Sequence, residues 1–321
     1  MKDRFGRKIN YMRISITDRC NLHCRYCMPE NITWTPSEEI LTCGEIERVC
    51  RVAVGLGITC FKVTGGEPLL REDCVRIIAG IKRIPGVKQV TVTTNGTLLL
   101  REWDALLDAG LDAVNISLDT TDRAQYERIT GYDGLPQVLA AVDLAEASGV
   151  PVRINAVLQE GMNDRAWRPL AELARERALD VRFIELMPIG ASAGAREVSN
   201  AGLLRAMRQV YPSLQPDDRV HGNGPAVYYR IDGFSGAVGF ISALHGKFCS
   251  RCNRIRLTAT GELKPCLCYD ERVPIRELLR AGRDDAVASA MRRVISTKPQ
   301  MHCFEDKTRV TESQSMVRIG G

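Results

Sequence analysis

The first two thirds of the chain alternates short runs rich in β-branched residues with longer runs in which apolar residues recur at helical spacing. The short runs predict strands at residues 11–17, 59–65, 89–94, 112–118, 151–157 and 180–186. The longer runs predict helices near 45–56 and over 72–84, 99–110, 135–149 and 164–178. Six strand–helix units in succession require a parallel sheet.

Unusual residues follow the carboxyl ends of most of these predicted strands. They are "TDRCNLHC" after the first strand, "GGEP" after the second, "TNG" after the third, "SLD" after the fourth and "LMP" after the sixth. A doubly wound sheet and a partly closed barrel both fit the repeating pattern. A barrel gathers the loops after its strands into one mouth, where its active site lies. The loops therefore favour an α/β fold of the partial (βα)6 TIM-type barrel class.

The pattern changes after about residue 190. Residues 188–203 predict a loop that leads into a helix, and residues 216–226 are rich in turn formers. Short strands are expected at 227–232 and 236–242, and helices over 273–282 and near 284–296. We therefore expect a main domain over residues 1–218 and a smaller C-terminal lobe over residues 219–321.

Composition narrows the classes of function. The chain has 321 residues, 45% of them apolar, and a net charge of only +5, which does not suggest a nucleic-acid binder. Such a balance suits a pocket for a small anionic ligand. No apolar run is long enough to span a membrane, and "MKDRFGRKIN" is no secretory signal. We expect a cytoplasmic protein whose twelve cysteines stay reduced and serve metal binding or catalysis.

The first group of cysteines has the spacing C-x3-C-x2-C. It comprises Cys20, Cys24 and Cys27. Thiolates suit zinc, copper(I) or iron–sulfur clusters, and a structural zinc site would need a fourth ligand such as His23. Three cysteines on one loop would instead leave one iron of a four-iron cluster without a protein ligand. The spacing favours this open cluster, with a zinc knuckle as the alternative.

With Tyr26 inside it, "CNLHCRYC" resembles the radical S-adenosylmethionine superfamily. The resemblance implies that the open iron binds S-adenosylmethionine and that the reduced cluster cleaves this cofactor to a 5′-deoxyadenosyl radical. It also implies cofactor contacts at Tyr26, Gly66, Ser117 and Met187. Taken alone, the glycines of "VTGGEP" fit a tight turn, Ser117 could cap a turn, and Met187 could pack in the core.

A second group of cysteines lies in "FCSRCNRIRLTATGELKPCLC". Its members are Cys249, Cys252 and Cys266, in the spacing C-x2-C-x13-C. Because Cys268 lies two residues further on, a four-cysteine zinc site is the alternative to a second open cluster. Arg254 and Arg256 alternate along an extended segment, so both guanidinium groups would face one side and could reach one anion.

Seven segments together resemble the GTP 3′,8-cyclase family nearly from end to end. They are "MRISITDRCNLHCRYCMP", "FKVTGGEPLLR", "TTNGTLL", "NISLDT", "RFIELMPIG", "FCSRCNRIRLTATGELKPCL" and the terminal "GG". The resemblance implies a lyase that uses the 5′-deoxyadenosyl radical to cyclise GTP to (8S)-3′,8-cyclo-7,8-dihydroguanosine 5′-triphosphate. Hydrogen is taken from ribose C3′, and the C3′ radical attacks guanine C8. This is the first step of molybdenum cofactor biosynthesis.

The same resemblance assigns roles to single residues. It implies one 4Fe-4S cluster on Cys20, Cys24 and Cys27, and a second on Cys249, Cys252 and Cys266 whose open iron meets the guanine. It implies GTP contacts at Arg13, Lys62, Thr93, Arg153, Arg182, Arg254, the backbone of Ile255, and Arg256. The first cysteine trio, Arg254, Arg256, Gly320 and Gly321 would be catalytic, the last two because the tail enters the active site. The family usually has Lys where this chain has Arg153, which replaces a point charge by a planar fork.

The resemblance also implies partners and leaves rivals to test. It implies an external low-potential electron donor and a downstream cyclic pyranopterin monophosphate synthase, and it allows a homodimer. No nucleic-acid or membrane partner is expected. One rival is a radical S-adenosylmethionine enzyme that modifies a peptide and carries an auxiliary cluster. A rival of another class is a non-catalytic zinc-binding protein.

Overall fold

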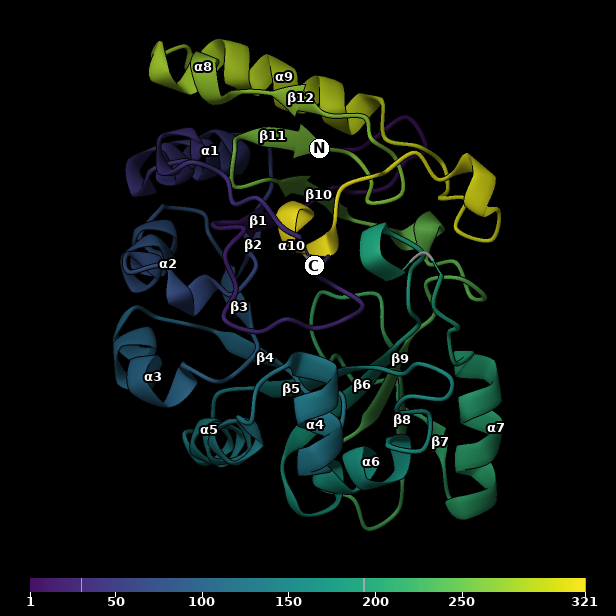
Figure 1. The fold of residues 1–321 in the computed structure, drawn as a ribbon. Coiled ribbons are helices and arrows are strands. Elements are labelled where there is room, and N and C mark those ends of the chain that lie inside the picture. Colours follow the sequence, from purple (N-terminus) through teal and green to yellow (C-terminus); the bar gives the residue numbers. More distant parts are fainter. Residues whose placement is uncertain (30, 193, 321) are drawn as a thin grey trace.

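The computed structural model describes residues 1–29, 31–192 and 194–320, and a ring of parallel strands lies at its centre (Figure 1). These strands are β1 (Tyr11–Ser15), β2 (Cys60–Thr64), β3 (Gln89–Thr94), β4 (Ala113–Ser117), β5 (Val152–Val157) and β6 (Leu179–Ile184). Between them run α1 (Cys43–Gly55), α2 (Cys74–Lys82), α3 (Leu99–Asp108), α5 (Leu135–Ala147) and α6 (Trp167–Glu176). The helices lie outside the strands, so the predicted partial barrel and its six strand–helix units are confirmed.

One helix of the barrel, α4 (Arg123–Thr130), was not predicted. The Asp122 side chain caps its first turn, and Gly131 ends it with a φ of 72°. The end of α4 supports the first cysteine loop, because the His23 N–H donates to the carbonyl of Thr130 over 2.8 Å. A helix with few apolar residues thus positions the loop on which the chemistry depends.

The C-terminal part of the chain adds strands to both edges of the barrel sheet. On one side β10 (Arg254–Leu257) pairs in parallel with β1 and is followed outward by β11 (Glu262–Lys264) and β12 (Val273–Pro274). On the other side β9 (Val238–Ile241) pairs in parallel with β6 and is followed by β8 (Val227–Arg230) and β7 (Gln215–Pro216). The expected boundary near residue 218 falls between β7 and β8 of this continuous sheet and stays a prediction.

The remaining helices cover the edges of the barrel. They are α7 (Asn200–Val210), α8 (Arg276–Arg280), α9 (Asp284–Ser296) and α10 (Met316–Ile319). Short 3-10 turns occupy Ser37–Glu39, Pro68–Leu70, Gly190–Ser192, Cys249–Arg251 and Lys307–Arg309. Both α8 and α9 lie against α1, where Arg48 donates to the Leu279 carbonyl over 3.0 Å. The C-terminal part is thereby tied to the first helix of the barrel.

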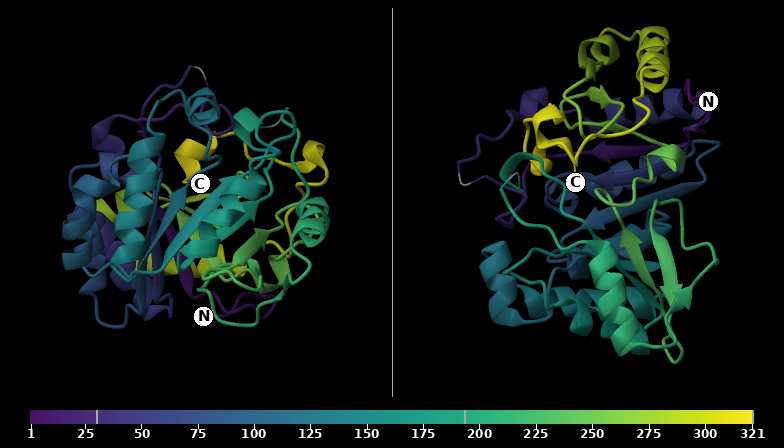
Figure 2. Two further views of the ribbon diagram at one scale, coloured as in Figure 1. Left: turned by 90° about the horizontal axis from the view of Figure 1, so that it is seen from below. Right: turned by 90° about the vertical axis from the view of Figure 1, so that its right-hand side faces the viewer.

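Two apolar clusters stabilise this arrangement. The larger cluster lies between the strands and the outer helices, where side chains such as Ile14, Phe61 and Trp103 are fully buried. The smaller cluster joins the loop after β6, the loop after β11 and the C-terminal tail through Ile189, Leu267, Cys268, Cys303, Phe304 and Ile319. In Figure 1, which looks along the ring of strands, α10 lies inside the ring, and Figure 2 shows the molecule from two further sides. None of the helices within the described residues is long and apolar enough to cross a membrane.

Candidate active site inside the barrel

The inner face of the sheet is polar and carries six cationic side chains. Residues that pair in register point to the same side, and the register aligns Arg13 with both Lys62 and Arg256. The same side continues through Thr91, Thr93, Asn115, Ser117, Arg153, Asn155 and Arg182, and on β10 through Arg254. The structure therefore brings all the side chains expected to bind GTP onto one face. Ile255 points into the core, which leaves only its backbone for binding.

Each of these neighbouring cations disfavours the charged form of the others. Burial, and then the neighbouring arginines, holds the pKa of Lys62 well below its usual value. Burial likewise lowers the pKa of Arg13 to about 10 and that of Arg256 to about 9, with contributions from Arg254. Lys62 has no hydrogen-bond or ion-pair partner among the residues that the structure describes. A cluster of this kind is costly in free energy unless an anion enters it.

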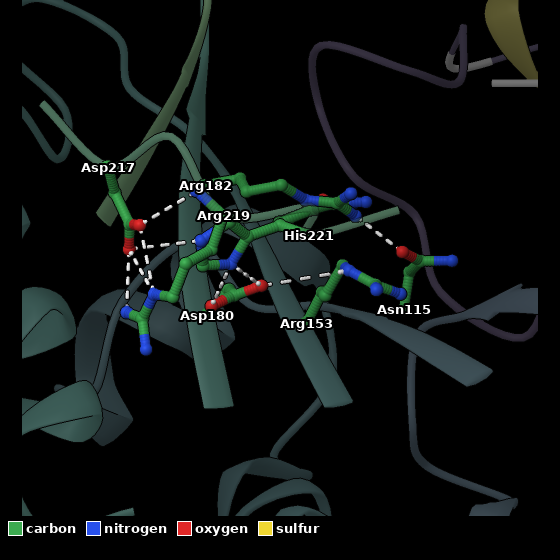
Figure 3. A network of polar contacts seen from close by, with 8 residues as sticks. Asn115, Arg153, Asp180, Arg182, Asp217, Arg219 and His221 are labelled. Carbon is green, nitrogen blue, oxygen red and sulfur yellow. Dashed lines mark hydrogen bonds and ion pairs between the residues drawn. The ribbon is translucent and has the colours of Figure 1, made fainter. Parts of the chain in front are cut away.

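Arg182 and Arg153 are among the cations that polar neighbours engage (Figure 3). The Arg182 guanidinium donates to the side-chain oxygens of Asn115 and Asn155, at 2.6 Å for the shorter contact with Asn155. Arg153 lies 3.8 Å from the carboxylate of Asp180, which in turn contacts His221 at 3.1 Å. These contacts orient both guanidinium groups.

The second nitrogen of His221 lies 3.0 Å from Asp217, so the imidazole bridges two carboxylates. Its ring stacks on Tyr228 with centroids 4.0 Å apart. Arg219 also pairs with Asp217 at 2.6 Å (Figure 3). The turn-rich segment after β7 therefore supports Arg153 from outside the inner face.

The first cysteine trio lies on the loop after β1, at the carboxyl ends of the parallel strands. All three thiols are partly exposed and none is in a disulfide. Burial raises the pKa of Cys20 to about 11 and that of Cys27 to about 12, and it raises that of Cys24 as well. The other thiols and Asp119 raise the pKa values of Cys24 and Cys27 further. The three thiols therefore lie on one loop and act on one another electrostatically.

The second cysteine trio lies at the opposite end of the strands. Arg254 pairs in register with Tyr11, the first residue of β1, and Cys249 and Cys252 precede it. Cys266 follows β11, which runs back antiparallel to β10. Burial raises the pKa of the Cys252 thiol, but Lys298 and Arg254 outweigh it and bring the pKa to about 7. A thiolate that neighbouring cations stabilise is a good ligand for iron.

Cys268 packs in the smaller apolar cluster. Its side chain is buried, and its sulfur lies 3.4 Å from the sulfur of Cys303 in the smaller apolar cluster. Cys43, Cys50, Cys60, Cys74 and Cys303 are buried, as expected of small apolar residues. Within residues 1–29, 31–192 and 194–320, no three or more His, Cys, Asp or Glu side chains are grouped to hold a metal ion.

The four residues expected to contact S-adenosylmethionine lie near the carboxyl ends of the strands. The Tyr26 hydroxyl donates to Asp119 over 2.8 Å. Gly66 lies so close to the cysteine loop that a Cβ atom there would be 2.3 Å from the Arg19 carbonyl oxygen, so only glycine fits. Ser117 ends β4, and Met187 packs half-buried against the smaller apolar cluster.

Two buried carboxylates near the first trio were missed by the sequence analysis. Glu67 accepts hydrogen bonds from the Leu69 and Asn95 N–H groups and the Thr94 hydroxyl, at 2.7–3.0 Å. Burial nevertheless raises its pKa to about 7, and it raises that of Asp119 to about 6. Both acids belong to the loops singled out as unusual, "GGEP" and "SLD". Their position just past a strand end was the signal that could have identified them.

The C-terminal tail reaches the inner face. Arg256 donates a hydrogen bond to the Gly320 carbonyl over 2.7 Å. Gly320 has a φ of 77°, and a Cβ atom there would be 2.9 Å from that of Ser15 at the end of β1. Glycine is therefore required on two counts. Gly321, the other tail residue expected to be catalytic, lies outside the described residues.

Family models and curated relatives cover nearly the whole chain. The model of the Radical SAM superfamily matches residues 14–174, and that of Molybdenum Cofactor Synthesis C matches residues 179–304. A GTP 3′,8-cyclase of Moorella thermoacetica is 44% identical over 326 residues, and one of Clostridium perfringens is 39% identical over 323 residues. In both comparisons the match covers 100% of this chain and 100% of the relative.

Solved structures share the fold at much lower identity. SuiB of Streptococcus suis, bound to S-adenosylmethionine, matches with a TM-score of 0.65 at 14% identity, over 97% of this chain and 77% of that chain. The enzyme anSMEcpe with bound AdoMet matches with a TM-score of 0.55 at 16% identity, over 86% and 82% of the two chains. These likenesses show the fold alone.

Proposed function

This chain belongs to the GTP 3′,8-cyclase family, and from that premise we propose how its residues bind and cyclise GTP. It is a radical S-adenosylmethionine lyase of the first step of molybdenum cofactor biosynthesis. Membership sets aside the peptide-modifying rival, which shares only the fold through SuiB, and the non-catalytic zinc protein.

Membership also implies one 4Fe-4S cluster and S-adenosylmethionine. When bound, these groups supply a 5′-deoxyadenosyl radical that can take a hydrogen atom from a ribose carbon. We propose Cys20, Cys24 and Cys27 as the ligands of this cluster. Tyr26, Gly66, Ser117 and Met187 would then contact the cofactor. Asp119 would fix the Tyr26 hydroxyl in this task, as its 2.8 Å hydrogen bond suggests.

The second cluster is part of the proposal. Cys249, Cys252 and Cys266 would hold a 4Fe-4S cluster whose open iron meets the guanine of GTP. Three features support it: the trio's position at the amino ends of the strands, its partial exposure, and the cations beside Cys252. The guanine end of the nucleotide would thus lie at the amino ends of the strands, and the first cluster would lie at their carboxyl ends.

The six cations of the inner face are the single observation that carries the GTP site. Arg13, Lys62, Arg153, Arg182, Arg254 and Arg256 line one face of the sheet. Burial, and then the charges of neighbouring cations, lowers the pKa values of Arg13, Lys62, Arg182 and Arg256. A triphosphate would neutralise this repulsion, and guanidinium forks would give it paired hydrogen bonds. Thr93 and the backbone of Ile255 would complete the contacts. Arg182 and Arg153, already engaged by protein groups, would act mainly through charge.

The tail would complete the enclosure of the substrate. Gly320 already contacts Arg256, one of the proposed GTP ligands, so Gly320 would border the nucleotide from the side of the first cluster. Gly321 stays a proposed catalytic residue. A tail without side chains at this point leaves room for the ribose and helps to exclude water.

The proposal extends to partners and location. The chemistry requires one electron from an external low-potential donor. A cyclic pyranopterin monophosphate synthase would take the product onward, a homodimer is allowed, and we place the protein in the cytoplasm.

Anaerobic reconstitution with iron and sulfide, followed by turnover with GTP, S-adenosylmethionine and a reductant, tests the proposal. We expect 3′,8-cyclo-7,8-dihydro-GTP together with 5′-deoxyadenosine and methionine, identified by mass spectrometry. Release of 5′-deoxyadenosine that does not depend on GTP, with no cyclised nucleotide, would refute it.

A further inference from the structure

Residues 298–302 cover the second cysteine trio, as their contacts with its segments show. The Lys298 side chain is only 2% exposed, and its ammonium donates to the Pro265 carbonyl, next to Cys266, over 2.6 Å. The charge of the same ammonium lowers the pKa of the Cys252 thiol and acts on Cys249. One buried positive charge therefore neighbours all three segments that carry the trio.

His302 contacts the trio from the other end of this segment. Its backbone N–H donates to the Cys249 sulfur over 3.4 Å. Its Nδ1 accepts from the Phe304 N–H over 3.4 Å, which places the proton of the neutral ring on Nε2. Nε2 is buried and has no partner in the part of the chain that the structure describes. A buried donor without an acceptor is costly, which points to an acceptor that the protein alone does not supply.

Arg7 locks the segment onto the cysteine loop. Its buried guanidinium donates to the carbonyls of Cys249 at 2.8 Å, Pro299 at 2.7 Å and Gln300 at 3.0 Å. Asp3 holds the same guanidinium through an ion pair at 2.6 Å. Lys298 and His302 are thus fixed relative to Cys249 before any metal is present.

We propose that Lys298 and His302 face the second cluster and raise its reduction potential above that of the first cluster. The inference rests on the second cluster of the proposed function. Reduction adds one electron from the external donor to the cluster, and a nearby positive charge and hydrogen bonds to sulfur stabilise that more negative state. The first trio has the opposite surroundings, the carboxylates Glu67 and Asp119. The donated electron therefore rests first on the cluster beside the substrate.

The test is a redox titration, followed by electron paramagnetic resonance, of protein in which Cys20, Cys24 and Cys27 are all alanine. In this background Lys298→Met should lower the ratio of reduced to oxidised cluster about tenfold at fixed potential, or about 59 mV. Lys298→Arg should stay within about threefold of the parent, because it keeps the charge. His302→Phe should lower the ratio about threefold and His302→Gln less, since glutamine keeps a donor.

Arg251→Met is the matched control. It removes the same charge one residue from Cys252, but Arg251 is exposed, so solvent should hold its effect below about twofold. Failure of the parent to bind iron at the second trio would refute the proposed function itself. An assembled cluster whose potential is unmoved by Lys298→Met, or moved equally by Arg251→Met, would overturn the inference alone. If the Lys298→Met protein does not assemble the cluster, the potential of the His302→Phe protein serves as the test, and an unmoved potential there would overturn the inference.

Discussion

The two cysteine trios have the same number of ligands and opposite electrostatic surroundings. The first lies beside the carboxylates Glu67 and Asp119, the second beside the cations Lys298 and Arg254. S-adenosylmethionine carries a sulfonium cation, which suits the acids beside the first trio, and GTP is a polyanion, which suits a site bordered by cations. We propose that these charges, rather than the cysteine spacing, decide which ligand each site takes.

The strands of the barrel keep these two environments apart. The first trio follows the carboxyl end of β1, and the second precedes β10, which runs parallel to β1. A strand of 5 residues such as β1 spans roughly 16 Å at about 3.3 Å per residue. The six cations occupy the face between the two trios. A nucleotide can therefore be held at one end while its ribose faces the other.

Single cysteine substitutions should separate the two sites most strongly. Cys24→Ala should abolish 5′-deoxyadenosine formation, because the first cluster would lose a ligand. Cys252→Ala should abolish the cyclised product while uncoupled cleavage of S-adenosylmethionine persists. Chromatographic assays of both products check this. Equal loss of 5′-deoxyadenosine in the two variants would mean that the sites do not divide the work.

Substitution of the two arginines of β10 should have the next largest effect. Arg254→Ala with Arg256→Ala should weaken GTP binding about a thousandfold, since each charge-assisted contact contributes about 1.5–3 kcal/mol. Equilibrium binding to the anaerobically reconstituted protein measures it, with the iron content as evidence that both clusters still assemble. Arg251→Ala is the control, an exposed arginine of the same segment. Unaltered GTP affinity in the double variant would show that Arg254 and Arg256 do not bind GTP.

The tail should give a smaller effect. Gly320→Ala puts a side chain at a positive φ and against Ser15, which should lower the population of the inserted tail and the rate of cyclisation about tenfold. Wild-type GTP affinity beside a reduced turnover number would fit a tail that acts during the reaction. An unchanged rate would show that the contact between Gly320 and Arg256 is not used.

The raised pKa of Glu67, near the first trio, can be tested through the pH dependence of stability. Burial raises the pKa of Glu67 from 4.5 to about 7, so the folded state binds this proton more tightly than the unfolded state. The stability it contributes is complete below pH 4.5 and is lost as the pH rises through 7, a difference of roughly 3 kcal/mol. Urea unfolding of the metal-free protein should show this loss, and Glu67→Gln should flatten it. Parallel pH profiles of the two proteins would count against the raised pKa.

The smallest effect should come from the nearby fourth cysteine. Cys268 contacts Cys303 in an apolar cluster, so Cys268→Ala should cost about 1 kcal/mol of stability and leave the iron content unchanged. Cys266→Ala, the matched variant, should lose the iron of the second cluster. Loss of iron from Cys268→Ala would show that Cys268 is a fourth ligand, so that the second cluster has no open iron.

Local sequence pattern was enough for the barrel and for the cysteine groups. The strands could be predicted because β-branched runs recur at a regular distance. The two cysteine groups could be recognised because spacings such as that of Cys20 and Cys24 are short-range features, and their role as ligands stays a prediction. The inward side of Arg254 and Arg256 followed from alternation along one strand. Each of these features is visible within a few consecutive residues.

Features that depend on long-range contacts could not be predicted in this way. The pairing of β10 with β1 joins residues more than 240 positions apart, and the approach of Lys298 to Cys252 depends on it. The engagement of Arg182 by Asn115 and Asn155 likewise needs three strands in register. The helix α4 was missed because only three of its residues, Tyr126, Ile129 and Thr130, are buried. Tertiary packing rather than local pattern decides these features.

The most direct test of two separate sites is to observe each cluster alone. One protein would carry alanine at Cys20, Cys24 and Cys27, the other at Cys249, Cys252 and Cys266, and each would be reduced and examined by electron paramagnetic resonance with either ligand. The account predicts that S-adenosylmethionine changes only the spectrum of the first cluster and GTP only that of the second. A spectrum of one cluster that responds to both ligands, while the other responds to neither, would contradict it.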